Sequence, residues 1–237
     1  MPGSVLKKNA RTLIFNNIPN VIITSLLYVT LTAIIAWLVI RLSGIIGLDE
    51  INTRLASGEI PSASIIFSDF KVISIFLAFA VFLFQPLLDV GFISFCLKLK
   101  RDKGADHKDL FNGFVFFIKI LTIFLITSLY ILMWSLLLII PGIVASYRYR
   151  LAYYILLDDP RKDALQCISE SRLIMNGKKL DLLTIDISFL GWFVLDALVI
   201  FLIPLPFAVP VVSLWLSPYL GLTRAGFYDD AVSKIAV

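Results

Sequence analysis

The sequence IIPGIVASYRYRLAYYILLDDP, residues 139–160, decides the topology of this chain, because it joins an apolar run to two arginines, Arg148 and Arg150. The apolar run begins upstream and extends over residues 114–145 without a polar loop. This run and the arginine-containing stretch after it form either one long helix or a hairpin of two helices. The choice between the two sets the side of the membrane on which everything downstream lies.

The composition is that of an integral membrane protein. Of the 237 residues, 59% are hydrophobic and 16% are charged. Soluble domains have about 45–50% apolar and about 25% charged residues. Several apolar runs reach the roughly 20 residues that cross a bilayer core as a helix. We therefore predict an all-α fold, a polytopic bundle of membrane-spanning helices, in a single domain over residues 1–237.

The basic residues favour the hairpin. Lysines and arginines collect in cytoplasmic segments of membrane proteins. In this chain they gather in the N-terminal segment, in the 98–113 loop and in residues 148–181. These three regions should share a side, which requires an even number of crossings between residues 113 and 158. Two helices satisfy this requirement, with an external turn around Ser128–Trp134, although Pro141 and Gly142 are also able to bend a helix here.

Six spans follow, with both termini in the cytoplasm and residues 41–71 as an external loop. The spans are expected near residues 21–40, 72–97, 114–131, 134–155, 182–203 and 207–223.

This topology places Arg148 and Arg150 in the cytoplasmic half of the fourth span. A long arginine can reach the headgroups from that depth at little cost. The two residues are about 200° apart around a helix and cannot share one face. We expect one of them to reach anionic headgroups and the other to turn inward, toward Asp89 or Asp186.

Two amphipathic surface helices are predicted, over residues 5–17 and 160–176. For the second, we expect Asp159 as the N-cap, Pro160 as the first helical residue and Gly177 as the C-cap. Its apolar face is narrow, and the remainder is largely polar, as in helices that lie on a membrane or on other helices. The face comprises Ala164, Cys167, Ile168, Ser171, Ile174 and Met175.

Ionisable residues within the spans are the candidate functional groups, because such residues are costly in a bilayer and usually face the bundle interior. They are Asp89, Lys119, Arg148, Arg150, Asp186 and Asp196. One interpretation is a path for an ion or solute, in which Asp196 lies deepest. The other is interhelical pairing, for example between Asp89 and Lys119 or Arg148, together with snorkelling near the interface.

Metal and nucleophile chemistry has little support in the sequence. The two cysteines, Cys96 and Cys167, are not spaced as a pair, and His107 is the single histidine. Zinc sites and Cys–His nucleophile pairs need more of these residues. The net charge of +4 comes from basic residues that flank apolar runs, which argues for membrane topology rather than nucleic-acid binding. We expect no cofactor and no enzymatic activity.

Several motifs occur in a characteristic order. GFISFCLKLKR follows the second span, and IIPGIVASYRYRLAYYILLDDP, SESRLIMNGKK, SFLGWFVL and LSPYLGLTRAGFYDD follow in turn. Together they resemble a bacterial integral membrane family, the domain of unknown function 975, found mainly in Firmicutes. The resemblance implies a multi-spanning protein of the cytoplasmic membrane and brings no catalytic residues. Small residues in these motifs suggest close helix packing or a partner surface. This candidate packing or partner motif comprises Ser171, Arg172, Met175, Gly177, Lys178, Gly191 and Trp192.

Three functions remain open from the sequence. The first is a non-enzymatic scaffold or accessory subunit, with the lipid bilayer and a membrane protein or a second copy as partners. The alternative is a component of a small-solute or ion transporter or channel that uses Asp89 and Asp196. The third is a lipid-interacting membrane enzyme, for which no nucleophile–base pair is visible.

Overall fold

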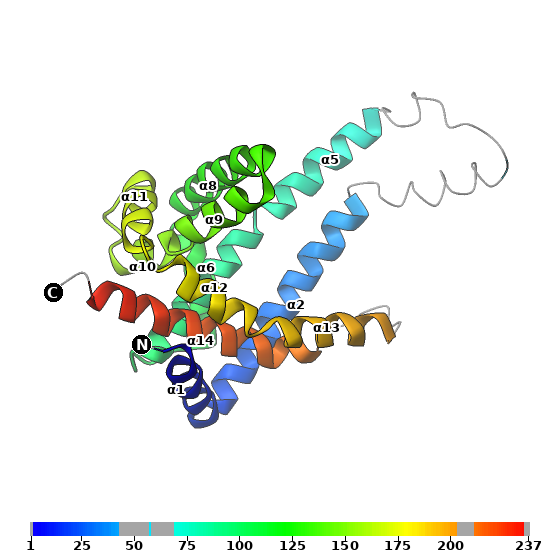
Figure 1. Ribbon diagram of the computed structural model, residues 1–237. Helices are drawn as coiled ribbons and strands as arrows, with labels where there is room; N and C mark the ends of the chain where they lie inside the picture. Colours follow the sequence, from blue (N-terminus) through cyan, green and yellow to red (C-terminus); the bar gives the residue numbers. More distant parts are fainter. Residues whose placement is uncertain (1, 43–56, 58–68, 203–210, 235–237) are drawn as a thin grey trace. The chain divides into compact units, whose positions relative to one another are not determined.

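The computed structural model of the protein describes residues 2–42, 57, 69–202 and 211–234, and every regular element within these ranges is helical. The elements are α1 (Gly3–Asn16), α2 (Ile18–Leu42), α5 (Asp69–Phe82), α6 (Gln85–Lys100), η1 (His107–Phe111), α7 (Asn112–Val115), α8 (Phe117–Leu137), α9 (Ile139–Tyr149), α10 (Ala152–Asp158), α11 (Ala164–Ile174), α12 (Lys179–Ile187), α13 (Leu190–Leu202) and α14 (Val211–Ser233). Figure 1 shows their course along the chain. The all-α prediction is confirmed for the part of the chain that the structure describes.

The chain divides into two compact units. The first comprises Met1–Val29 and Pro86–Val237, and the second comprises Thr30–Gln85. The second unit contains the later part of α2 and all of α5. The first unit holds the remaining helices and all the residues discussed below as a site.

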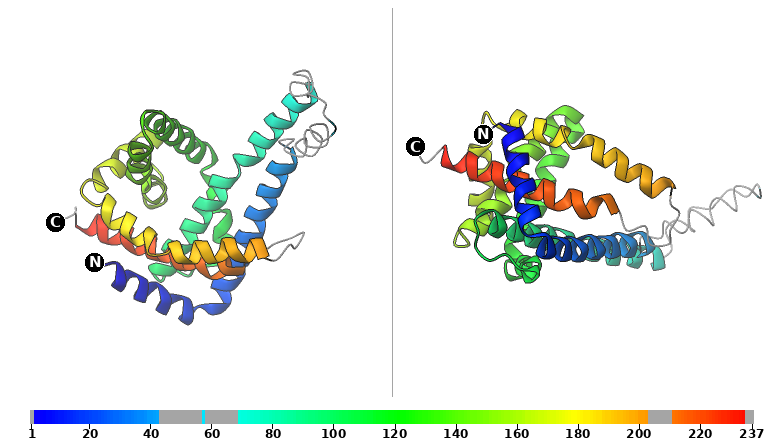
Figure 2. Two further views of the ribbon diagram at one scale, coloured as in Figure 1. Left: turned by 45° about the vertical axis from the view of Figure 1, so that its right-hand side comes forward. Right: turned by 90° about the horizontal axis from the view of Figure 1, so that it is seen from below.

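Two helical groups make up most of the first unit. In one group α8 and α9 form a tight antiparallel hairpin, and α11 packs against α8, α9 and α10. In the other group α14 lies alongside α12 and α13, and α1 packs across α12 and α14 (Figures 1 and 2). The N-terminal and C-terminal helices of the chain are therefore neighbours.

Four helices are long and apolar enough to cross a membrane, namely Ile18–Val39, Phe76–Lys100, Phe117–Leu137 and Lys179–Val199. They coincide with four of the six predicted spans and support the membrane class that the composition predicts. Of the other two, the span 134–155 corresponds to α9 and α10. The span 207–223 corresponds to the start of α14, except that its first four residues lie outside the described part of the chain. The predicted external loop, 41–71, also lies almost entirely outside it.

The predicted turn of the hairpin at Ser128–Trp134 is wrong. Helix α8 continues through these residues to Leu137, and the chain reverses at Leu138, where the backbone is extended with φ −161° and ψ 148°. A Cβ on Gly142 would lie 2.1 Å from the Ser135 Oγ, so glycine lets the two helices meet closely just after the turn. The residues around the turn are apolar and exposed, for instance Ile139 at 77%.

The start of the surface helix also differs from the prediction. Helix α11 begins at Ala164 rather than Pro160, and its N-cap is Asp163, which forms a capping box with Gln166. A capping box satisfies two otherwise unpaired backbone N–H groups, so it defines this end better than Asp159 and Pro160 do. The predicted C-cap is wrong as well: α11 ends at Ile174 with Met175 as its C-cap, and Gly177, at φ +75°, lies in the turn that follows.

Most of the predicted apolar face of each surface helix is buried in the first unit. In α11 these are Ala164, Cys167, Ile168 and Ser171, with Met175 just beyond the helix. In α1 the buried residues are Leu6, Ala10 and Ile14, whereas Leu13, which the sequence predicts on the apolar face with Leu6 and Ala10, is only partly buried. Both helices therefore cover other helices of the unit with their apolar sides.

Candidate functional site

A cavity of about 590 Å³ lies within the first unit. Residues of α2, α6, α8, α9, α10, α13 and α14 contribute to its wall, with Arg150 just after the end of α9. We call it the central cavity. Its polar lining consists of Tyr28, Asp89, Thr127, Ser146, Tyr149, Arg150, Tyr153, Tyr154, Ser217 and Arg224. Most of these residues belong to segments that the sequence predicts to lie in the membrane, where a polar lining usually faces a ligand or a water-filled path.

Two of the lining arginines are held by a carboxylate that does not itself line the cavity. The Asp186 Oδ1 accepts hydrogen bonds from Arg224, at 3.1 Å from Nε, and lies 3.0 Å from its Nη2. The Arg150 Nη2 lies 3.8 Å from the Asp186 Oδ2. Tyr147 donates its hydroxyl to the same oxygen at 3.0 Å. We call this group the Asp186 cluster, and its formal charge is +1 because one carboxylate faces two guanidiniums.

A second carboxylate lines the cavity directly. Tyr28 donates its hydroxyl to the Asp89 Oδ1 at 2.8 Å, and the Tyr28 ring stacks on Phe92 with centroids 4.3 Å apart. Asp89 thus faces the same space as Arg150 and Arg224. The cavity offers two cations and one anion to whatever occupies it.

A break in the helix places Arg150 in this arrangement. Helix α9 ends at Tyr149 and α10 begins at Ala152, which leaves backbone groups near Arg150 without helical partners. Ser171 of α11 satisfies two of them: its hydroxyl donates to the Arg148 carbonyl at 3.0 Å and accepts from the Leu151 N–H at 3.1 Å. Because Ser171 is fully buried, water cannot replace it.

The two arginines of the opening stretch therefore have different surroundings, as their spacing predicts. Arg150 turns inward to Asp186, one of its two expected partners. Arg148 lies against a separate groove formed with Trp134 and Lys179.

Two other predicted site residues do not line the central cavity. The Lys119 Nζ donates to the carbonyl oxygens of Pro160 at 2.7 Å and Lys162 at 3.0 Å. Asp196 is buried, and its Oδ2 accepts from the Ser213 hydroxyl at 2.6 Å, while its Oδ1 has no hydrogen-bond partner in the described part of the chain. Asp89 and Asp196 are thus not brought to one site.

The predicted packing motif separates into residues that pack and residues that do not. Ser171 and Met175 are buried, and the Lys178 Nζ donates to the Ala231 carbonyl at 2.7 Å. A Cβ added to Gly191 would meet no atom of the described chain within 4 Å, and Trp192 is exposed, so the expectation of close helix contact at these two residues is wrong. Arg172 is exposed as well.

Arg224 is the main site residue that the sequence reasoning missed. It follows the predicted last span by one residue and therefore was not counted among the intramembrane charges. The available signal was its position in the motif LSPYLGLTRAGFYDD, where it is the one cation among apolar and small residues. Tyr28 and Tyr147 were missed because a tyrosine in an apolar run is usually read as an interfacial aromatic.

A cluster of charges ties the ends of α6, α10 and α14 together. Arg101 binds Asp158 at 2.5 Å and Asp229 at 2.7 Å, and Tyr228 donates to Asp158 at 2.9 Å. Burial alone would raise the pKa of Asp158, but the hydrogen bonds from Arg101 and Tyr228 outweigh it and hold the pKa below 3.8. The stability that this lowered pKa contributes is present above pH 3.8 and is lost as the pH falls through the folded-state value.

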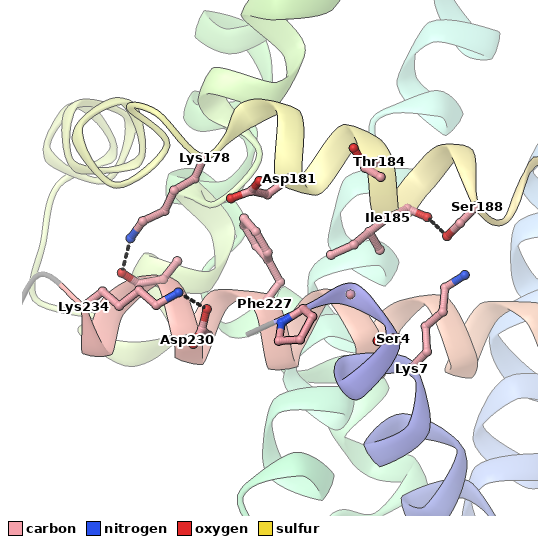
Figure 3. A pocket seen from close by; sticks show the side chains of 13 residues that line it. Ser4, Lys7, Lys178, Asp181, Thr184, Ile185, Ser188, Phe227, Asp230 and Lys234 are labelled. Carbon is pink, nitrogen blue, oxygen red and sulfur yellow. Dashed lines mark hydrogen bonds and ion pairs between the residues drawn. The ribbon is translucent and has the colours of Figure 1, made fainter.

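A second pocket, of about 480 Å³, lies between α1, α12 and α14 (Figure 3). Its lysines are largely engaged, since Lys178 binds the Ala231 carbonyl and Lys234 binds Asp230 at 2.8 Å. The hydrogen bond from Lys234 lowers the pKa of Asp230. The Lys7 Nζ lies 4.3 Å from the centroid of the Phe189 ring. These contacts join the terminal helices α1 and α14 to α12 and pair two of the three lysines that line the pocket.

Within the residues that the structure describes, no three His, Cys, Asp or Glu side chains gather where they could hold a metal ion. The central cavity can instead hold a small polar molecule by ion pairing with arginine and by hydrogen bonding to tyrosine and serine hydroxyls.

Residues 135–234 match the family model of a protein of unknown function (DUF975). The match confirms the resemblance predicted from the motifs, and it includes Arg150, Ser171, Asp186 and Arg224. Neither a curated protein nor a solved structure matches the chain.

Proposed function

We propose that this chain is a six-span protein of the bacterial cytoplasmic membrane whose central cavity binds a small solute with an anionic group, as a component of solute transport. The observation that carries the proposal is the pair of arginines in the cavity wall, held in place by Asp186. A structural ion pair needs one cation for its carboxylate. The second arginine at the same carboxylate gives the Asp186 cluster a formal charge of +1, so a solute's anionic group would bind on this side of the cavity, opposite the anion that Asp89 supplies.

The central cavity distinguishes solute binding from the scaffold role, which is the first of the three functions inferred from the sequence. A scaffold or accessory subunit needs an exposed partner surface and no internal polar space. Such a surface is available on α11, where Leu165 and Leu173 are 62% and 70% exposed. The scaffold role therefore stays as the second candidate, and the solute test distinguishes the two.

The solute test uses the purified full chain in proteoliposomes, with radiolabelled acetate, inorganic phosphate, glutamate and glycine as probes. We expect binding or flux of at least one probe, reduced at least tenfold in both Arg150→Gln and Arg224→Gln. Arg172→Gln, which changes an exposed arginine of α11, is the matched control and should behave as the wild type.

A further variant guards against misfolding. Ser217→Leu fills the cavity without removing a charge, so it should abolish binding while leaving the Asp186 cluster intact. If no probe binds to the wild type, or if binding survives all three cavity variants, the solute proposal loses its support and the scaffold role stands.

The proposed topology rests on contacts near the helix ends. The Arg101 cluster joins the ends of α6, α10 and α14, and Lys119 at the start of α8 binds carbonyls in the segment before α11. These segments therefore belong to one side of the bundle, and they carry many of the basic residues that mark a cytoplasmic face. The packing of α1 on α12 and α14 supports the proposal that both terminal helices have their chain ends on this side.

Labelling of intact cells tests the topology. Single cysteines are introduced by Ser57→Cys and Arg161→Cys in a Cys96→Ala, Cys167→Ala background and treated with an impermeant maleimide. We expect labelling of the first variant only, and labelling of both after permeabilisation. Reaction of the Arg161→Cys variant in intact cells would overturn the six-span topology.

A further inference from the structure

A groove of about 340 Å³ lies on the first unit, apart from the central cavity, and shares none of its lining residues. Its apolar wall includes Trp134 of α8 and Ile140, Pro141 and Val144 of α9. Its polar groups are the side chains of Arg148 and Lys179. We call it the Arg148 groove.

Both cations of this groove lack a counter-charge. Within the described part of the chain, neither Arg148 nor Lys179 makes a side-chain hydrogen bond or ion pair, and the buried Arg148 Nε has no partner. By contrast, Arg150 and Arg101 are both ion-paired. No carboxylate of the described residues lines the groove. An anionic ligand would therefore neutralise the two cations.

The length and the lining of the groove indicate what kind of anionic ligand it can hold. Arg148 and Ile140 are eight residues apart in one helix, which is about 12 Å along its axis at about 1.5 Å per residue. Beyond Ile140 lie the exposed apolar residues of the hairpin turn. The groove is therefore cationic at one end and apolar toward the other, over a length that suits part of an acyl chain.

We propose that an anionic phospholipid occupies the Arg148 groove, with its phosphate between Arg148 and Lys179 and an acyl chain along Ile140 and Val144. Guanidinium and ammonium groups bind phosphate oxygens strongly, and basic pockets between membrane helices favour anionic headgroups. The lipid would supply the missing counter-charge and cover the apolar wall at the same time. This inference does not depend on the solute proposal, because the two sites have no residue in common.

The first test measures which lipid stays bound. The full chain is purified in mild detergent, incubated with phosphatidylglycerol or phosphatidylcholine, and analysed by native mass spectrometry. We expect at least tenfold preferential retention of phosphatidylglycerol by the wild type, lost in Arg148→Gln/Lys179→Gln. Arg172→Gln/Lys108→Gln removes two exposed cations elsewhere and should retain the preference. Equal retention of both lipids, or an unchanged preference in the groove variant, would overturn the proposal.

A second measurement leaves both cations in place, so it remains decisive if the double variant does not fold. Trp134 lines the groove, and brominated acyl chains quench tryptophan fluorescence on contact. Brominated phosphatidylglycerol should quench the wild type more than brominated phosphatidylcholine does, and Trp134→Phe should remove that difference. A difference that persists in Trp134→Phe would place the lipid elsewhere. Loss of the difference on adding millimolar inorganic phosphate would indicate a phosphate site without lipid selectivity, which also contradicts the proposal.

Discussion

Replacing Gly91 by alanine is expected to destabilise the protein by about 3 kcal/mol or more, at or above the upper end of the usual range for an overpacked core. A Cβ at this position would lie 1.7 Å from the Leu110 carbonyl oxygen, and the opposing atom is backbone, which cannot rotate away. Gly113 meets the Leu87 carbonyl in the same way, at 2.0 Å. The two glycines therefore set the distance between α6 and the η1–α7 segment.

Thermal and denaturant unfolding of the purified protein in detergent would measure this effect. The matched control is Gly191→Ala, also a helical glycine, which has open space around the added methyl group. It should be neutral or stabilise by up to about 1 kcal/mol, because alanine is the better helix former. Similar stability of Gly91→Ala and Gly191→Ala would show that the close approach of η1 to α6 is not as described.

The second large effect is expected for Asp186→Ala. This change removes the carboxylate that Arg150 and Arg224 share, and breaking a buried ion pair typically costs about 3–5 kcal/mol. Since both arginine side chains retain some exposure, at 37% and 23%, we expect the low end of this range. The measurement is the free energy of unfolding in detergent.

Asp181→Ala is the control for this experiment. Asp181 lies on the same helix, is exposed and makes no hydrogen bond or ion pair in the described part of the chain, so its loss should change stability by less than about 0.5 kcal/mol. A double-mutant cycle between Asp186→Ala and Arg224→Ala should give a coupling above about 1 kcal/mol. Additive effects would mean that the two side chains do not interact.

The sequence predicts well those features that depend on local periodicity. The apolar runs locate four candidate spans, and the 100° spacing identifies most of the buried face of α11. The same spacing predicts that Arg148 and Arg150 diverge, and the structure sends one of them to Asp186. These predictions need only the helix geometry.

Features that depend on distant contacts could not be predicted. The hairpin turn at Leu138 carries no polar residue, since packing of Gly142 on Ser135 rather than turn chemistry sets its position. The break after α9 is stabilised by Ser171, which lies about twenty residues along the chain. Arg224 joins the site only because α14 packs beside α12.

The apolar turn between α8 and α9 has a consequence for how the chain enters the membrane during synthesis. Helix α9 has only 11 residues and is followed at once by Arg150, so it is too short and too polar to partition into lipid by itself. Helix α8 has 21 residues, most of them apolar, and is long enough to partition alone. In the proposed topology no charged group at the turn would have to be carried across, so the two helices would pass from the translocon into lipid as one loop. Helix α8 would supply the driving force, and Arg148 and Arg150 would stay on the side of synthesis.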